Sequence, residues 1–264
     1  MKLTILGSGS GIIKKDRQAP GYLVELDSGE TLLFDCGGTT IQQFTNINFD
    51  YLGLDHILIS HPHADHLGGF MPLIFAIKLK SMYSKHLGIK ERTKTLFLYG
   101  YPGFFKDYKL LRKMMSPEPD ETYPIKVIEY KNQKVQYPGF TLETKLVPHA
   151  EKYYKNKCLA FRLEADGKSF IYSGDSKYCK QLGELAKNAD LALIDSSGLG
   201  EGLGEKGYHI TPEGVGKVAQ ESGVKKLILT HHYEVKSPQQ IIEEARKYYS
   251  GEIILAEDLM EIKI

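Results

Sequence analysis

The sequence predicts an α/β (α+β) fold made of two related halves, each a sheet with flanking helices, that meet at one site. A hairpin signal followed by an aspartate occurs twice, first before Asp35 and again, roughly 140 residues later, before Asp175. In each half a short apolar strand follows, at 57–59 and 191–194, and polar side chains stand at its end. Because the chain contains no linker or low-complexity segment, we expect residues 1–264 to form a single domain.

The composition of the chain excludes several classes of protein. The 264 residues are 42% hydrophobic and 25% charged, as in ordinary globular proteins, and a net charge of +1 gives no overall field for nucleic acid or membrane. Three widely spaced cysteines argue against a disulfide framework and indicate a reducing compartment. The stretch Met1–Gly7 is too short for a signal peptide, and no apolar run has the length of a membrane span. We therefore expect a cytoplasmic enzyme with no membrane partner.

The elements of the first half follow from apolar patterns and turn signals. Strands are predicted over residues 3–6, 22–26, 31–34 and 57–59. The glycine-rich turn Gly7–Gly11 has the spacing GxGxG rather than the dinucleotide-binding GxGxxG, and no helical pattern follows it. The stretch 70–94 begins as a helix. Its apolar face is predicted to consist of Phe70, Leu73, Ile74, Ile77 and Met82.

The remaining elements complete the first half and build the second. Further strands are predicted over residues 96–99, 127–130, 140–147, 158–163, 169–172, 191–194, 227–229 and 253–256, the last of which ends the fold. Helices are predicted over 104–115, from Thr211 onward and over 238–249, and loops over 116–120 and 198–207. Thr211 is a favourable N-cap, and Pro212 suits the first position of a helix.

The stretch from Ser60 to Gly69 carries the most specific chemical signal in the chain. It places His61, His63, Asp65 and His66 within six residues, directly after an apolar strand and before a helical pattern. Neutral imidazoles and carboxylates are the ligands that suit Zn²⁺ and its neighbours. The pattern HxHxDH therefore predicts a metal site at the end of a buried strand.

Three further candidate ligands, His149, Asp175 and His231, also stand just after predicted strands. Strand ends gather at one edge of a layered fold, where functional loops are held on a rigid scaffold. One ion needs three or four protein ligands, so seven candidates suit two ions that share a carboxylate. We therefore predict two divalent metal ions as cofactors, with Zn²⁺ as the first choice and Mn²⁺ or Fe as alternatives.

These features together resemble the metallo-β-lactamase fold hydrolases. The resemblance rests on the HxHxDH motif, a later lone histidine, an aspartate after Gly174 and the pair Thr230-His231, and it covers nearly the whole chain. It implies a four-layer αββα sandwich. It also implies that the first metal is held by His61, His63 and His149, that the second is held by Asp65, His66 and His231, and that Asp175 bridges both.

Within this superfamily the chain is most similar to the ribonuclease Z-like phosphodiesterases. The similarity is carried by the segments Phe34–Gly37, Leu98–Gly103, His209–Thr211 and Leu227–His231, and by Asp175 at the bridging position. The chain differs from tRNA-processing members in three respects. It has no obvious tRNA-gripping arm before His149, Ser176 replaces a threonine, and the usual Ser and Arg after His231 are missing. The resemblance therefore implies the hydrolase class and leaves the substrate open.

Two residues beyond the seven ligands have predicted roles. His209 is the candidate general acid, because an imidazole can donate a proton near neutral pH; the alternative is a loop histidine that packs locally. Asp35 is predicted to accept the second N–H of a metal-binding histidine, since ligating imidazoles usually need such a partner.

The other histidines and the cysteines have simpler interpretations. His231 and His232 compete for the last ligand position, and the strand-end position favours His231. His56 and His86 are assigned to structure or to the surface. The three cysteines are expected to pack as small apolar groups.

The predicted function is that of a metal-dependent phosphodiesterase of the ribonuclease Z-like type, in which a metal-bridging hydroxide attacks phosphorus in line. Asp65 would orient the hydroxide, and His209 would protonate the leaving oxygen. The alternatives are a tRNA 3′-processing endoribonuclease proper and a carboxylic ester, lactone or thioester hydrolase at the same site. A metal-bound redox protein is disfavoured because no flavodoxin or rubredoxin segment is present. A non-catalytic nucleic-acid-binding homologue is disfavoured because all seven ligands are kept.

Two basic stretches bear on the substrate. The first contains Lys78, Lys80, Lys85, Lys90, Arg92 and Lys94, and the second contains Lys152, Tyr153, Tyr154, Lys155 and Lys157. Lysines interleaved with tyrosines can hold a phosphate backbone or stack on a base, although ordinary solvated faces have the same composition. RNA therefore stays among the expected partners beside a phosphodiester or ester substrate, and a homodimer stays open as the assembly.

Overall fold

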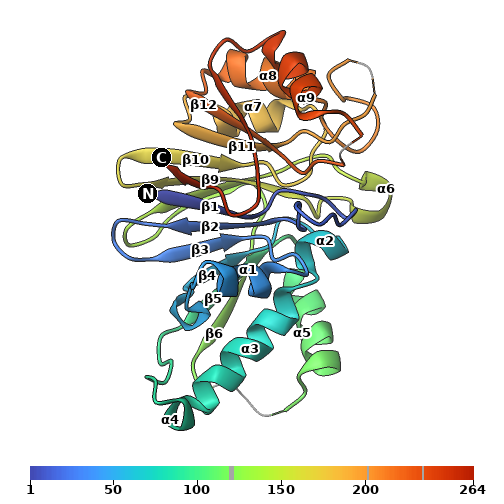
Figure 1. The fold of residues 1–264 in the computed structure, drawn as a ribbon. Helices are drawn as coiled ribbons and strands as arrows, with labels where there is room; N and C mark the ends of the chain where they lie inside the picture. The colour runs from blue at the N-terminus through green and yellow to red at the C-terminus, as the bar shows by residue number, and fades with distance from the viewer. Residues whose placement is uncertain (119–121, 201, 234) are drawn as a thin grey trace.

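Two seven-stranded mixed sheets pack face to face in the computed structural model, which describes residues 1–118, 122–200, 202–233 and 235–264 (Figure 1). The first sheet has the strand order β14-β1-β2-β3-β4-β5-β6. Its strands are β1 (Lys2–Gly7), β2 (Gly21–Glu25), β3 (Thr31–Phe34), β4 (His56–Leu58), β5 (Leu96–Gly100), β6 (Ile125–Glu129) and β14 (Glu261–Lys263).

The second sheet has the strand order β13-β12-β11-β10-β9-β8-β7. Its strands are β7 (Gln133–Gln136), β8 (Thr141–Leu146), β9 (Leu159–Ala165), β10 (Lys168–Tyr172), β11 (Leu191–Asp195), β12 (Lys226–Thr230) and β13 (Glu252–Leu255).

The two sheets have the same pattern of strand pairing. In the first, the pairings from β14 to β3 are antiparallel and those from β3 to β6 are parallel. In the second, the pairings from β7 to β10 are antiparallel and those from β10 to β13 are parallel. The hairpins β2–β3 and β9–β10 occupy equivalent places, and each leads to its aspartate. The sequence-based prediction of two related halves is therefore confirmed.

Helices form the two outer layers. They are α1 (Thr40–Asn46), α2 (Ala64–Leu67), α3 (Phe70–Met82), α4 (Ser84–Leu87), α5 (Phe104–Met115), α6 (Glu151–Tyr154), α7 (Lys180–Ala186), α8 (Pro212–Ser222) and α9 (Pro238–Arg246), with a short 3₁₀ helix at Tyr51–Gly53. Helices α1, α3 and α5 lie on the side of the first sheet, and α7, α8 and α9 cover the second (Figure 1). The predicted αββα sandwich is confirmed.

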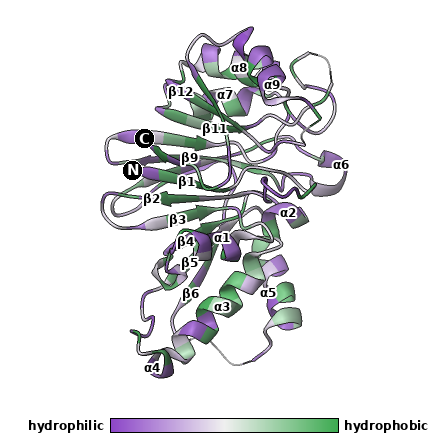
Figure 2. Cartoon of the chain, viewed as in Figure 1, coloured by the Kyte–Doolittle hydropathy of each residue, from purple (hydrophilic) through white to green (hydrophobic). Residues whose placement is uncertain are grey.

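Alternation along the strands divides the apolar side chains between the layers. In β11, Leu191 and Leu193 belong to the core cluster that extends between the sheets, whereas Ala192 and Ile194 pack in the cluster beneath α7, α8 and α9. Successive side chains of a strand point to opposite faces, so a continuous apolar run indicates a strand covered on both sides. Figure 2 shows this as green strands between helices of mixed colour.

Several boundaries differ from those predicted. The helix that starts at Phe70 ends at Met82, where the chain turns, and Met82 is 49% exposed instead of packing inward. The last helix ends at Arg246, three residues short of the predicted end. The fold does not end with the strand at 252–255, because β14 follows and pairs with β1. The elements missed altogether are β7, β14, α1, α6, α7 and the 3₁₀ helix, which are short or weakly apolar.

Two predicted loops fall partly on residues for which no structure is given. The predicted loop 116–120 includes residues 119 and 120, and the loop 198–207 includes residue 201, all of which lie outside the described residues. Within the described part of the chain, no helix has both the length and the apolar character needed to cross a membrane.

His56 is a structural histidine of the first sheet. Its Nδ1 lies 3.1 Å from the Tyr99 hydroxyl, and its ring stacks on Phe97 with centroids 5.3 Å apart. Burial lowers the pKa of the imidazole from 6.5 to about 4. The folded state therefore disfavours protonation of His56, whereas the unfolded chain takes up the proton as soon as the pH falls below 6.5.

We expect this mismatch to cost stability between pH 6.5 and pH 4. His56→Gln cannot titrate in this window, so wild type should lose about 2 kcal/mol more of its unfolding free energy than this variant between pH 7 and pH 5. Urea unfolding at the two pH values measures the difference. His86→Gln, at an exposed histidine, is the control and should follow wild type. Equal losses in wild type and His56→Gln would contradict the expectation.

Candidate metal centre

All seven predicted ligands lie at the ends of strands on one edge of the sandwich. Strand β4 leads into the loop with His61 and His63 and then into α2, which carries Asp65 and His66. From the second sheet, His149 follows β8, Asp175 follows β10 and His231 follows β12. The structure thus brings together side chains that are separated by up to 170 residues in the chain.

His61, His63, His149 and Asp175 form one cluster, in which one potential ligand atom per residue lies within 4.8 Å of the others. His63 Nδ1 is 2.8 Å from His61 Nε2 and 3.2 Å from His149 Nε2. Asp175 Oδ2 is 3.6 Å from His61 Nε2 and 3.7 Å from His149 Nε2. These four residues are the set predicted for the first metal with the bridging aspartate.

Asp65, His66 and His231 form a second cluster by the same criterion. His231 Nε2 is 3.3 Å from His66 Nε2 and 3.4 Å from Asp65 Oδ2. Asp175 Oδ1 is 3.2 Å from His66 Nε2 and 3.5 Å from His231 Nε2. One oxygen of the Asp175 carboxylate therefore faces each cluster, as a bridging ligand would.

The donor atoms fit a metal because hydrogen bonding alone leaves them unsatisfied. Asp175 is 3% exposed, yet its Oδ1 has no hydrogen-bond partner. Several imidazole nitrogens point at one another, and two ring nitrogens without hydrogens cannot bond. A cation between them would satisfy both the nitrogens and the carboxylate oxygen.

The opposite ring nitrogens fix the tautomers of two histidines. His149 Nδ1 donates to the carbonyl of Tyr208 at 2.8 Å, and His66 Nδ1 donates to Asp35 Oδ2 at 2.7 Å. In the neutral form of each histidine, Nε2 therefore carries its lone pair into the site, which is the state that binds a metal.

Asp35 is the centre of a buried network that joins the two sheets. Besides His66, it accepts hydrogen bonds from the backbone N–H and the hydroxyl of Ser60, both at 2.7 Å, and from the Tyr172 hydroxyl. Tyr172 belongs to the second sheet. Asp35 thus makes the contact with a site histidine that the sequence-based prediction requires. Its backbone φ of 55° lies in the left-handed region, where a residue other than glycine is strained.

Gly174, the residue before Asp175, is required by the close packing at this strand end. Its φ is 54°, and a Cβ there would lie 2.6 Å from the carbonyl oxygen of Leu159 and 2.9 Å from the side chain of Ser60. Any side chain would push β10 away from the strand that leads to His61. The Gly-Asp pair of the motif therefore has a steric origin.

His209 lies beside the predicted metal ligands and is held at both ring nitrogens. Its Nδ1 donates to Asp195 Oδ2 at 2.8 Å, and its Nε2 lies 3.1 Å from the Tyr233 hydroxyl. Asp195 and Tyr233 were given no role from the sequence. The position of Asp195 directly after a predicted strand was an available signal, whereas Tyr233 had none. His232, the competitor of His231, is buried and bonds the Leu229 carbonyl, away from both clusters.

The charges in the site are strongly coupled. Burial, and then the neighbouring His66, lower the pKa of His61 well below its usual value. Burial opposes protonation of His231 and His66 too, but the surrounding carboxylates, Asp175 foremost, outweigh it and raise both pKa values. Burial of Asp65 is outweighed by His66 and His231, which lower its pKa to about 2. The bare site thus balances carboxylates with protons that a metal would displace.

The pKa of His209 is also set by a balance between burial and a neighbouring carboxylate. Burial disfavours its charged form, but the Asp195 carboxylate outweighs burial and raises the pKa of His209 above its ordinary value. The protonated imidazole is therefore more favourable at this position than in a free histidine.

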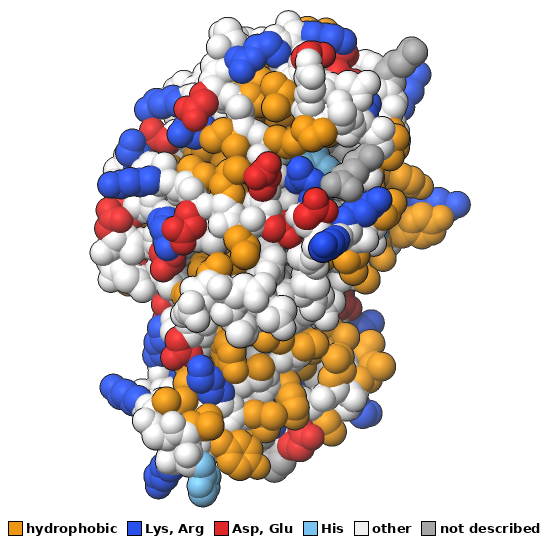
Figure 3. Space-filling model, in the orientation of Figure 1, with side chains coloured by type: hydrophobic (Ala, Val, Ile, Leu, Met, Phe, Trp, Pro, Cys, Tyr) orange, Lys and Arg blue, Asp and Glu red, His pale blue; other side chains and the backbone are white. Residues whose placement is uncertain are grey.

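The two basic stretches differ in their surroundings. In the first, Lys78 is buried, Lys80 pairs with Asp50, Lys94 pairs with Asp55, and Arg92 donates to backbone carbonyls inside the protein. This stretch is thus largely used within the fold. The second lies beside the site, because the Tyr154 ring meets the His63 ring edge to face at 4.8 Å. On the face that Figure 3 shows, lysine and arginine side chains are interspersed with acidic ones and form no continuous patch.

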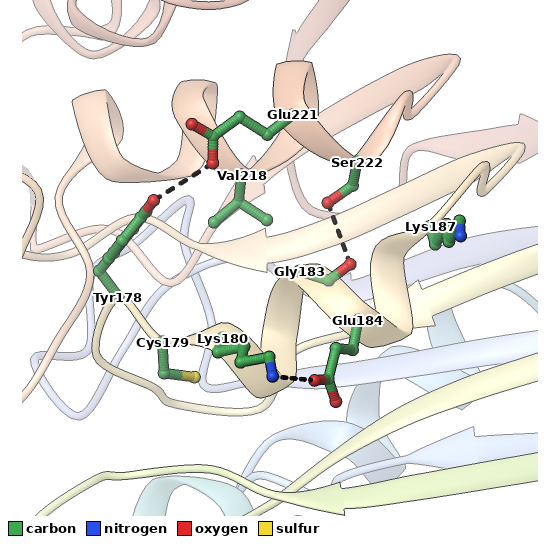
Figure 4. Close-up of a pocket in the computed structure, with 9 residues that line it drawn as sticks. All are labelled: Tyr178, Cys179, Lys180, Gly183, Glu184, Lys187, Val218, Glu221 and Ser222. Atoms are coloured by element: carbon green, nitrogen blue, oxygen red, sulfur yellow. Dashed lines mark hydrogen bonds and ion pairs between the residues drawn. The ribbon is translucent and has the colours of Figure 1, made fainter.

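A separate cavity of about 500 Å³ opens between α7 and α8 (Figure 4). It is lined by Tyr178, Cys179, Lys180, Gly183, Glu184, Lys187, Val218, Glu221 and Ser222, none of which is a predicted ligand. Burial raises the pKa of the Cys179 thiol, so the side chain stays protonated. Cys36 and Cys158 are buried and free, as predicted.

The fold and this site define a metal-dependent hydrolase of the metallo-β-lactamase superfamily, similar to ribonuclease Z. The family model described as Anti-Pycsar protein Apyc1 matches residues 1–250, and the chain belongs to that family. The sequence is 26% identical to a ribonuclease Z of Methanosarcina acetivorans, over all of this chain and 98% of the relative. It is also 26% identical to the probable metallo-hydrolase YhfI of Bacillus subtilis, over 97% of each chain.

Solved structures agree with the fold. The crystal structure of the metallo-β-lactamase fold protein YhfI from Bacillus subtilis superimposes with a TM-score of 0.81 at 24% identity, covering 99% of this chain and 98% of the other. The short form of human tRNase Z superimposes with a TM-score of 0.76 at 20% identity, covering 100% and 99%.

We expect Asp175→Asn to weaken metal binding at least about tenfold, because both clusters lose a charged oxygen. Metal content after dialysis against a weak chelator measures the loss. Asp195→Asn is the matched control, since Asp195 is an equally buried carboxylate that contacts His209. This control matters because Asp175, Asp195, His209 and His231 also come within ligand distance of one another. If Asp195→Asn lost as much metal as Asp175→Asn, that third grouping would be a metal site instead.

Proposed function

We propose that this protein is a dinuclear metal-dependent phosphodiesterase of the ribonuclease Z-like type. The observation that carries the proposal is the Asp175 carboxylate, which turns one oxygen toward His61 and His149 and the other toward His66 and His231. A shared carboxylate between two ligand clusters is the arrangement that a pair of ions a few ångströms apart requires.

The residues of each cluster suit a divalent ion. We assign His61, His63 and His149 to the first metal, Asp65, His66 and His231 to the second, and Asp175 to both. Sets of imidazoles and carboxylates favour Zn²⁺ and admit Mn²⁺ or Fe. Two such ions would supply a hydroxide nucleophile at neutral pH and neutralise charge on the phosphate oxygens.

The protein's own groups would orient the reaction and move its proton. Asp65 is partly exposed at the edge of the site, where its carboxylate can accept a hydrogen bond from the attacking water and fix its direction. His209, whose pKa is raised by the Asp195 carboxylate that holds it, would donate its Nε2 proton to the leaving oxygen. The Tyr233 hydroxyl occupies this nitrogen in the free protein, so a substrate oxygen would take its place.

Aromatic side chains around the site support a substrate that contains a nucleobase. Tyr154 packs against His63, and the half-exposed Tyr208 has its ring 6.3 Å from that of His149. Exposed rings beside a phosphate-binding site can stack on bases, and Lys152 and Lys155 add positive charge nearby. RNA is one such substrate.

A tRNA 3′-processing activity is the second candidate, supported by the names of the relatives. The alignment with the Methanosarcina acetivorans ribonuclease Z extends over 306 positions, whereas this chain has 264 residues, so that relative carries insertions that this chain lacks. The missing tRNA-gripping arm agrees with this difference and favours a smaller phosphodiester.

A substrate panel tests the proposal. With two equivalents of Zn²⁺ or Mn²⁺, the protein should hydrolyse bis-p-nitrophenyl phosphate and prefer it to p-nitrophenyl acetate, a carboxylic ester. A tRNA precursor in the same panel tests the second candidate. Fewer than two bound metals per chain, or a preference for the carboxylic ester, would contradict the dinuclear phosphodiesterase.

The role of His209 has its own signature. His209→Ala should slow hydrolysis of a phosphodiester with an alkoxide leaving group by about 100-fold, because that oxygen needs a proton. It should have little effect on a p-nitrophenolate leaving group, which departs without one. Rates of both substrates in wild type and variant check the difference. Equal losses on the two substrates would instead assign His209 to binding or structure.

A further inference from the structure

The last predicted ligand, His231, has an unusual backbone. Its φ is 64°, in the left-handed region that residues other than glycine rarely adopt, and the residue is buried. Such a conformation costs of order 1–3 kcal/mol and persists only where the surroundings hold it in place. A change at this φ would redirect the Cα–Cβ bond and turn the imidazole away from His66 and Asp65.

The surroundings that hold His231 come from the opposite end of the chain. The carbonyl oxygen of Ser8 accepts hydrogen bonds from the backbone N–H groups of His231 at 3.0 Å and His232 at 3.3 Å. Ser8 directly follows β1 and is completely buried. A short parallel bridge between Gly9 and His232 continues the contact.

Ser8 is itself fixed by Asp258, in the turn between β13 and β14. Asp258 Oδ1 accepts hydrogen bonds from the Ser8 N–H and the Ser8 hydroxyl, both at 2.8 Å. Its Oδ2 accepts from the Gln18 N–H at 2.8 Å and from Gln43 Nε2 at 3.5 Å. All four partners are donors, so the carboxylate satisfies each of them, whereas an amide would set its own NH₂ against at least one.

We propose that Asp258 is a positioning residue for His231, acting through the Ser8 carbonyl to maintain the left-handed backbone that aims the imidazole at the second ligand cluster. The inference rests on the proposed metal role of His231. Asp258 touches none of the seven ligands and lies 27 residues beyond the last of them. Groups that orient metal ligands from outside the coordination shell typically change metal affinity 10- to 100-fold when they are replaced.

The test compares Asp258→Asn with Asp190→Asn. Asp190 makes the same pair of contacts, accepting hydrogen bonds from the N–H of Ser169 at 2.9 Å and its hydroxyl at 3.0 Å, but it precedes β11, at the end of the second sheet away from the ligands. A merely structural role would make the two variants alike. Ser8→Ala is the milder variant, because it keeps the backbone N–H contact with Asp258 and removes only the contacts of the Ser8 hydroxyl, with Asp258 at 2.8 Å and with Arg17 Nη1 at 3.0 Å.

The first measurement needs no metal. Backbone amide exchange of His231 and His232, followed by NMR in metal-free protein, should be about tenfold faster in Asp258→Asn and unchanged in Asp190→Asn. The second is a Zn²⁺ titration of metal-free protein against a chromophoric chelator. Asp258→Asn should raise one of the two Zn²⁺ dissociation constants about tenfold and leave the other near its wild-type value.

Unchanged exchange at both amides, or equal weakening of both zinc sites, would overturn the proposal. If Asp258→Asn failed to fold, Ser8→Ala would be used in its place. Amide exchange at the wild-type rate in Ser8→Ala would also overturn the proposal. If wild-type protein bound a single Zn²⁺, the dinuclear function would be refuted. The role of Asp258 would still be tested by the amide exchange, which is measured without metal.

Discussion

The site depends on one buried carboxylate surrounded by imidazoles that arrive from both sheets. Asp175 follows a strand of the second sheet. Among the histidines within 4 Å of its oxygens, His61 and His66 come from the first half and His231 comes from the second. A buried charge without partners is expensive, so Asp175 makes close packing of the two edges necessary for stability as well as for chemistry. Folding and assembly of the site are thus the same event.

Two of the strained backbone positions lie where this convergence is closest. Asp35 and His231, one from each half, are both in the left-handed region, and each stands directly beyond a strand. Tyr172 reaches from the second sheet to Asp35, and the Tyr22 hydroxyl reaches from the first sheet to Thr230 at 2.9 Å. Each sheet therefore supports the strained position on the other. Networks of this kind hold ligand side chains in place before a metal arrives, which reduces the ordering that binding must accomplish.

The sequence was informative where local pattern decides structure. The hairpins, the HxHxDH turn, the placement of the candidate ligands at strand ends and the Thr211 cap could all be recognised, because periodicity and turn residues determine them over a few positions. The edge strands β7 and β14 could not, since their short polar segments become strands only through their neighbours. Tyr172, Tyr233 and Asp258 have ordinary local sequences. Their importance comes from partners more than 20 residues away, and no spacing rule identifies such contacts.

The pairing of β14 with β1 joins residues 2–4 to residues 261–263 and so places the end of the second half in the first sheet. Contacts between such distant segments form late, because a long loop must close before they contribute. On a ribosome, this edge of β1 would stay unpaired until residues 261–263 had emerged. An unpaired edge strand is a template for aggregation, so the period before β14 arrives is when the nascent protein would most need protection. Once β14 is in place, the two halves cannot separate without breaking its pairing with β1 in the first sheet.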